Sequence, residues 1–313
     1  MAGHSGMTDL ATRIKQAEPE QQREKVVSKV LLLQAGCLTA MKAIPDHSVN
    51  MVLCDLPYGT TQNSWDSVIP LNRLWREYER VLAAQGVVVL TGQGPFTARL
   101  MISNEAWFKY KLVWEKSKPT NFLNAKKQPL RKHEDICVFY PRQPKYTPQM
   151  GAGEAYDKGV RKDQLTGSYG DFKPAHIKSA GGRYPTDVIY HKTAESEGTV
   201  YHATQKPVGP GQYLIRTYTA PGDVVLDNAF GSGSFLVAAA MEGRSAIGIE
   251  LNEDVELFRN GAVDLIEVAQ QRLSEVPGCK TKVSPTSPAR EFRKAIEWIF
   301  DPALAIAARK AKP

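Results

Sequence analysis

The sequence has few cysteines and lacks any long apolar run. Only four of its 313 residues are cysteine, none lies in a C-x-x-C pair, and their spacing is too wide for the ligand sets of zinc sites. We expect reduced thiols and no metal site at these residues, which are Cys37, Cys54, Cys137 and Cys279. No segment approaches the ~20 apolar residues of a membrane helix, and the first residues, MAGHSGMTDLATRIKQ, contain no apolar signal-peptide core. We therefore expect a protein that is neither secreted nor embedded in a membrane.

The charge balance is basic without being extreme. Lysine and arginine total 40 against 33 aspartate and glutamate residues, which gives a formal net charge of +7. Such an excess suggests an anionic partner, although it is also common in proteins that bind none. Hydrophobic residues make up 42% of the chain, an ordinary globular composition that can bury the core of one large or two modest domains.

Short apolar runs that end in turn residues alternate with amphipathic segments along most of the chain. The runs predict parallel strands buried on both faces, at residues 30–36, 49–56, 86–92, 223–230 and 244–250. The amphipathic segments predict helices, at residues 71–86, 95–105, 211–220, 234–243 and 261–273. Two further predicted strands, 110–116 and 135–140, flank a basic loop. The alternation indicates an α/β fold with a Rossmann-like, doubly wound, mostly parallel sheet and an antiparallel hairpin strand.

Composition divides the chain into four parts. The segment from Pro141 to Ala203 is rich in glycine, proline, tyrosine and lysine with little periodicity, which indicates an insertion with mostly loop structure. We therefore expect a main domain built from residues 30–140 and 201–275, with a loop-rich region at 141–200. Residues 1–29 predict an N-terminal helix or tail, and residues 276–313 predict a C-terminal helical extension.

The segment VVLDNAFGSGSFLVAA, residues 224–239, predicts a strand, a turn with Gly231 and Gly233, and a helix. Glycines in such a turn let a ligand approach the main chain at the carboxyl end of the strand. Glu250 closes the next predicted strand, where an acid can accept both hydroxyls of a ribose. The glycine motif that binds a nicotinamide dinucleotide has a small residue at the position that Leu236 occupies here. The pattern fits an adenosine ligand without phosphates, such as S-adenosylmethionine, better than a dinucleotide; an ordinary tight turn is the other alternative.

The stretch DLPY, residues 55–58, lies at the carboxyl end of a predicted strand. The Asp55 carboxylate and the Leu56 carbonyl can accept the two N–H bonds of a nucleobase amine, which turns the nitrogen lone pair toward an electrophilic methyl group. Pro57 stiffens the turn, because its φ is locked and it has no competing N–H. Tyr58 offers a flat face for a base rotated out of a duplex, and such stacking contributes ~1–3 kcal/mol. Alone, the stretch is also compatible with an ordinary strand exit.

Three stretches, DLPYGT, HATQKP and LDNAFGSGS, together resemble the DNA amino-methyltransferases, and GQGPF, FLNAKKQPLRKHEDICVFY and GGRYPTDVIY add a likeness to phage adenine methylases. The amino-methyltransferases transfer a methyl group from S-adenosylmethionine to adenine N6 or cytosine N4. The tetrapeptide precedes the glycine turn, an order similar to the beta group of the family, in which target-recognition residues lie between the two motifs. The resemblance covers residues 30 to 265 and implies that 141–200 is a target-recognition region.

The resemblance assigns a role to each matching position. The tetrapeptide that binds the target amine is matched by Asp55, Leu56, Pro57 and Tyr58. The segment that closes over the methionine part of the cofactor is matched by Thr204, Gln205, Lys206 and Pro207. The cofactor turn and the ribose acid are matched by Asp227, Phe230, Gly231, Ser232, Gly233 and Glu250.

Three positions depart from the family's pattern. Leu56 replaces a commoner proline, but only its carbonyl is needed. Ala203 also replaces a proline and loosens a turn. Gly36 stands where the family usually has an aspartate near the cofactor adenine, so we expect that contact to be weaker or supplied elsewhere.

Cations concentrate between residues 109 and 132, where the only acid is Glu115. This concentration favours phosphate contacts, with an ordinary solvated face as the alternative. Further cations in the loop-rich region suit contacts to base edges. The expected DNA-binding residues are Lys116, Lys118, Lys126, Lys127, Arg131, Lys132, Arg161, Lys162 and Arg183.

Two pairs of residues near these motifs have less specific roles. Trp65 and Asp66 follow the tetrapeptide, and we expect both to help hold a flipped base, with packing in the core as the alternative for Trp65. His133 and Glu134 have no second ligand pair at metal spacing. We expect them to be structural or to position the loop that holds the base.

The main hypothesis is a site-specific DNA methyltransferase that flips adenine out of double-stranded DNA and methylates its N6 by direct SN2 transfer. An aspartate rather than a serine at position 55 favours adenine over the nearest alternative, cytosine N4. Cytosine C5 methylation needs a nucleophilic cysteine, and strand alternation turns Cys54 away from Asp55. The remaining alternatives are a nicotinamide-dependent oxidoreductase and a non-catalytic DNA-binding protein.

The resemblance also carries expectations about partners and location. It implies double-stranded DNA as substrate, a possible homodimer, and a cytoplasmic, nucleoid-associated protein of a bacterium or phage. Roles in restriction–modification or epigenetic regulation follow from the family, while the sequence identifies no partner endonuclease and no recognition site.

Overall fold

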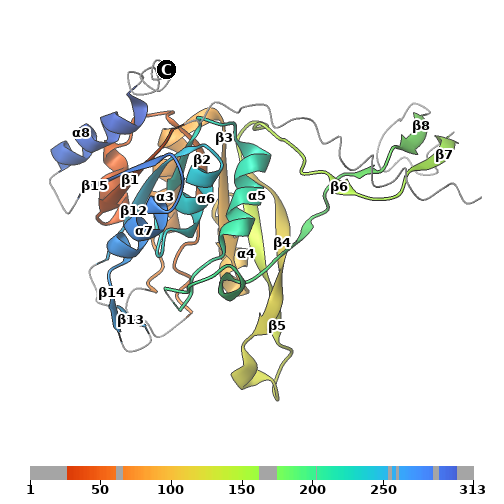
Figure 1. Ribbon diagram of the computed structural model, residues 1–313, viewed down its shortest axis with the longest axis horizontal. Helices are drawn as coiled ribbons and strands as arrows, with labels where there is room; N and C mark the ends of the chain where they lie inside the picture. Colours follow the sequence, from red (N-terminus) through yellow and green to blue (C-terminus); the bar gives the residue numbers. More distant parts are fainter. Residues whose placement is uncertain are drawn as a thin grey trace, which may run out of the picture.

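The computed structural model describes residues 27–60, 66–161, 175–201, 203–252, 256–258, 261–284 and 289–301 (Figure 1). Several expectations lie outside these residues: those for the N-terminal segment up to residue 26, for Trp65, for Lys162 and for the chain beyond Asp301.

A nine-stranded sheet forms the centre of the protein, in the order β10-β4-β5-β3-β2-β11-β12-β1-β15. Neighbouring strands are parallel except where β5 pairs with β3 and with β4. The expected mostly parallel α/β fold with an antiparallel hairpin is therefore confirmed. The strands are β1 (Ser28–Gln34), β2 (Val49–Cys54), β3 (Leu82–Gly92), β4 (Phe108–Thr120), β5 (Arg131–Phe139), β10 (Val188–His191), β11 (Val224–Asp227), β12 (Ser245–Glu250) and β15 (Cys279–Ser284).

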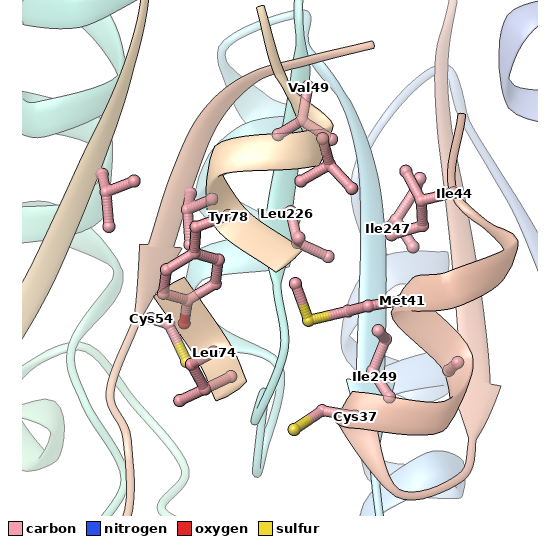
Figure 2. Close-up of a cluster of buried hydrophobic side chains, with 14 of the residues drawn as sticks. Cys37, Met41, Ile44, Val49, Cys54, Leu74, Tyr78, Leu226, Ile247 and Ile249 are labelled. Atoms are coloured by element: carbon pink, nitrogen blue, oxygen red, sulfur yellow. The ribbon is translucent and has the colours of Figure 1, made fainter. Parts of the chain in front are cut away.

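Helices cover both faces of the sheet, because successive residues of a strand point to opposite sides. In β1, Leu31 and Leu33 join one core, whereas Val30 and Leu32 join the other. Figure 2 shows part of the first core, which packs against α2 (Cys37–Ala40), the 3-10 helix η1 (Met41–Ala43), α3 (Leu71–Val81), α4 (Pro95–Ser103) and α8 (Ala289–Phe300). The second core packs against α5 (Val208–Tyr218), α6 (Ser234–Met241) and α7 (Leu265–Ser274). No helix in the described ranges has the length and apolarity needed to cross a membrane.

Strands β4 and β5 form a hairpin that projects beyond the helices (Figure 1). Their pairing runs from Phe108 with Phe139 out to Thr120 with Arg131, with an irregularity after Glu115. Both strands therefore extend into the basic segment predicted as a loop, β4 to Thr120 and β5 from Arg131, and the tip between them contains the 3-10 helix η2 (Phe122–Asn124). Beyond the sheet this ribbon has no core to cover, so its strand residues are polar and carry no apolar signal.

The loop-rich region contains only short strand pairs. They are β6 (Gly151–Ala152) with β9 (Gly182–Arg183), and β7 (Tyr156–Arg161) with β8 (Ala175–Ser179). The region extends away from the helices and the sheet (Figure 1). It returns through β10, which pairs with β4 at the edge of the main sheet, and through the 3-10 helix η4 (Ala194–Ser196).

Three elements differ from the predicted pattern for local reasons. Helix α3 ends at Val81 rather than at residue 86, because Leu82 already pairs with Val49 of β2. Helix α7 begins only at Leu265, where the Asp264 side chain accepts hydrogen bonds from the first free N–H groups. The preceding residues form the hairpin of β13 (Glu256–Phe258) and β14 (Gly261–Val263). The unpredicted strand β15 reads CKTKVS, with the charges typical of a sheet edge.

Candidate active site

Asp55, the glycine turn and Glu250 lie at the carboxyl ends of three neighbouring parallel strands. These strands, β2, β11 and β12, are adjacent in the sheet. Doubly wound folds bind ligands at this edge, where the strand order reverses. Asp55, Gly231 and Glu250 all line one cavity of about 1050 Å³. The structure therefore brings together two motifs that lie far apart in the sequence.

The segment that precedes α5 forms another wall of the same cavity. Its lining residues are Thr204, Gln205, Lys206 and Pro207, and the tetrapeptide contributes Asp55, Leu56, Pro57 and Tyr58. The Gln205 side chain accepts a hydrogen bond from the Tyr201 N–H at 2.9 Å, which fixes the start of this segment. All three motifs that carry the family resemblance therefore contribute to one cavity.

Two hydroxyl groups bind the same oxygen of the Asp55 carboxylate. The Tyr58 hydroxyl donates to Asp55 Oδ1 at 2.7 Å, and the Thr91 hydroxyl donates a short hydrogen bond to the same atom. Burial, and then the Asp55 carboxylate, hold the pKa of Tyr58 well above its ordinary value, so Tyr58 stays a hydroxyl donor. Thr91, at the end of β3, is a site residue that the sequence motifs do not reveal.

One face of the Tyr58 ring is already occupied. The ring stacks on Phe96 of α4 with centroids 4.8 Å apart and planes 27° apart. This contact holds the ring in place beside the cavity. Any base that stacks on Tyr58 must therefore use the face opposite Phe96, and that role stays a prediction.

Lys206 links the tetrapeptide to both strands of the hairpin, directly to Glu134 of β5 and through it to Lys116 of β4. Its Nζ lies 2.9 Å from Asp55 Oδ2 and 3.0 Å from Glu134 Oε2. The other Glu134 oxygen forms a short ion pair with Lys116. Burial alone would lower the pKa of Lys206, but the Asp55 and Glu134 carboxylates outweigh it and raise that pKa well above its ordinary value. The four side chains thus form a chain of alternating charges.

The glycine turn is held by the acid at the end of β12. Gly231 has a φ of +53°, and its N–H donates to Glu250 Oε2 at 2.7 Å. The Leu251 N–H donates to the other Glu250 oxygen at 3.0 Å. Gly233 has a φ of +77°, and a Cβ there would come within 2.9 Å of the Ala269 Cβ. Both glycines are needed, one for the shape of the turn and the other also for its close approach to α7.

The cavity wall offers open space and an unsatisfied donor that fit a nucleoside ligand. A Cβ placed on Gly231 would meet no atom of the described residues within 4 Å, so the main chain there is open to contact. Asn228 also lines the cavity, and its buried Nδ2 lies near the Cys37 thiol with no other partner among the described residues. Gly36 lies in the same wall. Asn228 is therefore a further candidate for ligand contact, next to the predicted Asp227.

Asp227 is a buried acid in this wall. It is 2% exposed, lies beside the Cys54 thiol and accepts a long hydrogen bond from the Ala229 N–H at 3.4 Å. Burial raises its pKa from 3.8 to about 8. Burial, and then Asp227, also raise the pKa of Cys54, so that residue remains a thiol and is a poor nucleophile.

Replacing Asp227 with asparagine should change how stability depends on pH. Between about pH 4 and about pH 8 the folded wild type binds more protons than the unfolded chain, so this residue's contribution to the free energy of unfolding falls as pH rises. Asp227→Asn lacks that loss and should gain stability relative to wild type across the window. Chemical denaturation of both proteins at a series of pH values measures the difference, and a constant difference contradicts the raised pKa.

Asp66 supports the turn after the tetrapeptide. Its two carboxylate oxygens accept hydrogen bonds from the N–H groups of Gly59 and Thr60, each at 2.8 Å. Gly59 has a φ of +66°, a conformation that needs such support. The structure therefore gives Asp66 a role in shaping the main chain beside the active site.

The expected DNA-binding cations separate into distinct groups. Lys116 is 7% exposed and paired with Glu134, so its ammonium lies inside the site, and its expected contact with phosphate stays a prediction. Arg183 is held within the loop-rich region by Ser179 and by the Tyr156 ring. Lys132 pairs with Glu115 at 2.7 Å. Lys132 is itself exposed, as are the other expected cations at or near the hairpin tip, which are Lys118, Lys126, Lys127 and Arg131.

The fold is Rossmann-like, and the tetrapeptide and the glycine turn share one cavity at the carboxyl edge of its sheet. A family model described as DNA methylase, of the N6 and N4 methyltransferase type, matches residues 49–257. The chain therefore belongs to the DNA methylase family. This confirms the expectation of a DNA methyltransferase that uses S-adenosylmethionine as its methyl donor.

Individual proteins of this family are similar to the chain at low identity. Type II methyltransferase M.HinfI of Haemophilus influenzae is 24% identical over 280 residues, which are 78% of this chain and 68% of that protein. The M1.HpyAVI–SAM complex has a TM-score of 0.52 at 18% identity, covering 78% of this chain and 98% of that one. The PvuII cytosine-N4-specific DNA methyltransferase has a TM-score of 0.54 at 12% identity, covering 88% and 94%. The structural likeness supports the fold. It does not distinguish adenine from cytosine as the target base, which depends on the residues of the site.

Proposed function

We propose that this chain flips an adenine out of double-stranded DNA and methylates its N6. The observation that carries the proposal is the single cavity shared by Asp55 and the glycine turn. Direct transfer requires the amine and the methyl donor to be held together in one orientation. Two sites on separate faces of the protein would not meet that requirement.

Of the two Asp55 oxygens, Oδ2 is the one that the Tyr58 and Thr91 hydroxyls do not bind, and it contacts Lys206 in the DNA-free protein. Tyr58 and Thr91 both donate to Oδ1, and a carboxylate oxygen accepts about two hydrogen bonds. The amine therefore binds Oδ2, and the Leu56 carbonyl accepts its second N–H. Pro57 keeps the turn between these acceptors rigid.

The glycine turn and the wall opposite it hold the methyl donor. S-adenosylmethionine, when bound, supplies a sulfonium methyl group for transfer to the nitrogen. Glu250 binds the ribose while it also fixes the Gly231 N–H. The remaining cofactor residues, carried over from the family, are Thr204, Gln205, Lys206, Pro207, Asp227, Phe230, Ser232 and Gly233.

Adenine is favoured over cytosine because position 55 is an aspartate rather than a serine. Incubating the protein with S-adenosylmethionine and DNA, then digesting the DNA to nucleosides for mass spectrometry, tests this directly. We expect N6-methyldeoxyadenosine. N4-methyldeoxycytidine would overturn the choice of base, and unmodified nucleosides from DNA of varied sequence would overturn the proposed activity.

The hairpin tip is proposed as a DNA-binding surface. Phe122 and Leu123 are 76% and 84% exposed at its end, and Lys126 and Lys127 follow them, also exposed. Thr120 and Arg131, at the base of the tip, line the same cavity as Asp55. The lysines suit phosphates, and exposed apolar side chains suit insertion between bases.

Two double variants should separate these contributions. Lys126→Gln with Lys127→Gln should reduce the slope of log affinity against log salt by up to about 2, because each phosphate contact contributes about 0.9. Phe122→Ser with Leu123→Ser should weaken DNA binding while leaving the salt slope unchanged. Fluorescence anisotropy with a DNA duplex at several salt concentrations measures both. Wild-type affinity and slope in both variants would contradict a role for the tip.

A homodimer and a cytoplasmic, nucleoid-associated location are proposed from family likeness alone, as are roles in restriction–modification or epigenetic regulation. Light scattering with and without DNA measures the oligomeric state. A monomeric mass in both conditions would remove the dimer.

A further inference from the structure

The lysine at the active site occupies the acceptor that the substrate amine requires. Lys206 Nζ lies 2.9 Å from Asp55 Oδ2, and Oδ1 already accepts two hydroxyls. An ammonium N–H and an amine N–H make the same kind of hydrogen bond to a carboxylate. In the DNA-free protein, Lys206 therefore stands in for the target amine.

Glu134 offers Lys206 a second partner at nearly the same distance. Lys206 Nζ is 3.0 Å from Glu134 Oε2 and 2.9 Å from Asp55 Oδ2, so the ammonium already lies between the two carboxylates. It can move away from Asp55 without losing its contact with Oε2. Glu134 is itself fixed, because Lys116 pairs with its other oxygen.

The burial of the cluster keeps these charges coupled. The side chains of Lys206, Glu134 and Lys116 are 14%, 10% and 8% exposed. If the buried Lys206 ammonium moved away from Asp55 and found no other carboxylate, the unpaired charge would destabilise the protein by several kcal/mol. With Glu134 in place, the ammonium can release Asp55 and remain paired.

We propose that Lys206 is a placeholder for the target amine and that Glu134 is the positioning residue that receives Lys206 when the amine binds Asp55. Glu134 touches neither the base nor the cofactor in this scheme. Lys116 serves to anchor Glu134. The inference rests on the proposed function, because it concerns the amine that Asp55 binds.

Glu134→Gln tests the scheme by removing the receiving charge. Lys206 should then stay on Asp55, and kcat at saturating S-adenosylmethionine should fall by between about 10-fold and about 100-fold, as a misplaced catalytic group does. The Kd for S-adenosylmethionine, measured by calorimetry, should change by less than about 3-fold.

A double-mutant cycle shows whether Glu134 acts through Lys206. In a Lys206→Met background no ammonium occupies Asp55, so Glu134 has no ammonium to receive. Adding Glu134→Gln should then lower kcat by less than about 3-fold. A purely structural role for Glu134 predicts the full loss in both backgrounds. Thermal unfolding of every variant confirms that the rates compare folded proteins.

Asp135→Asn is the matched control. Asp135 is the next residue on β5, is equally buried at 8% and pairs with Lys111 at 2.7 Å, but it points to the opposite face of the sheet. It should keep kcat within about 3-fold of wild type while lowering stability. An equal loss of kcat in this control would attribute the effect to the hairpin as a whole and overturn the proposal.

The outcomes distinguish this inference from the proposed function. A wild-type protein that methylates no DNA base removes the proposed function, and with it the basis of the inference. A wild type that methylates adenine, together with a fully active Glu134→Gln, removes the inference alone.

Discussion

Asp55→Ala should lower kcat for methyl transfer by at least about 100-fold, the loss typical when a preorganised partner of a reacting group is removed. The alanine variant has no carboxylate to accept the amine N–H, so the nitrogen lone pair stays delocalised in the ring. It also frees the Tyr58 and Thr91 hydroxyls and leaves Lys206 with Glu134 only. Single-turnover transfer from labelled S-adenosylmethionine, with all enzyme bound to DNA, measures the chemical step.

DNA affinity should be kept or slightly increased in Asp55→Ala, since one negative charge is removed from a cavity that faces a polyanion. Asp46→Ala is a suitable control, because Asp46 is an exposed acid that pairs with Arg80 outside the cavity. It should transfer methyl groups at the wild-type rate. Wild-type transfer by a folded Asp55→Ala protein would refute the catalytic assignment.

Glu250→Ala should raise the Kd for S-adenosylmethionine by between about 10-fold and about 100-fold, the range expected for a lost hydrogen bond to a charged group. The loss has two sources. The carboxylate no longer binds the ribose, and the Gly231 N–H loses its acceptor at 2.7 Å, so the turn that faces the cofactor is less ordered. Calorimetric titration with S-adenosylmethionine measures the change.

Glu250→Gln separates the two sources, because its amide oxygen can still accept from Gly231 while the charge is gone. We expect its Kd to lie between those of wild type and Glu250→Ala. Glu267→Ala, an exposed acid in the first turn of α7, should bind the cofactor as wild type does. An unchanged Kd in Glu250→Ala would exclude both contributions.

The site shows where local sequence patterns stop being informative. Asp55, Gly231 and Glu250 can be found because each follows an apolar run and therefore lies at the end of a buried strand. Glu134 and Lys116 lie within a basic, polar hairpin, where composition alone predicts side chains that contact solvent or phosphate. Only their pairing inside the site shows that Lys116 neutralises a buried acid.

The boundaries of helices and strands are also not determined by local sequence patterns alone. The Leu82 side chain continues the apolar pattern of α3, yet its main chain pairs with β2, because strand pairing with a distant segment outweighs a local helix preference. β15 escapes prediction for a related reason: its lysines alternate on a sheet edge, and its pairing with β1 depends on a strand far earlier in the chain.

The sequence by itself determined the parallel α/β fold, the methyltransferase motifs and the family, because buried strands require continuous apolar runs and a glycine turn requires glycines. The tertiary structure alone decided which charges meet. Lys206 contacts both Asp55 and Glu134 only because the sheet order places β5 beside β3 and β3 beside β2. Ion pairs between distant segments depend on that arrangement in space, since a charged residue has the same local sequence signal whether its partner is water, phosphate or a buried carboxylate.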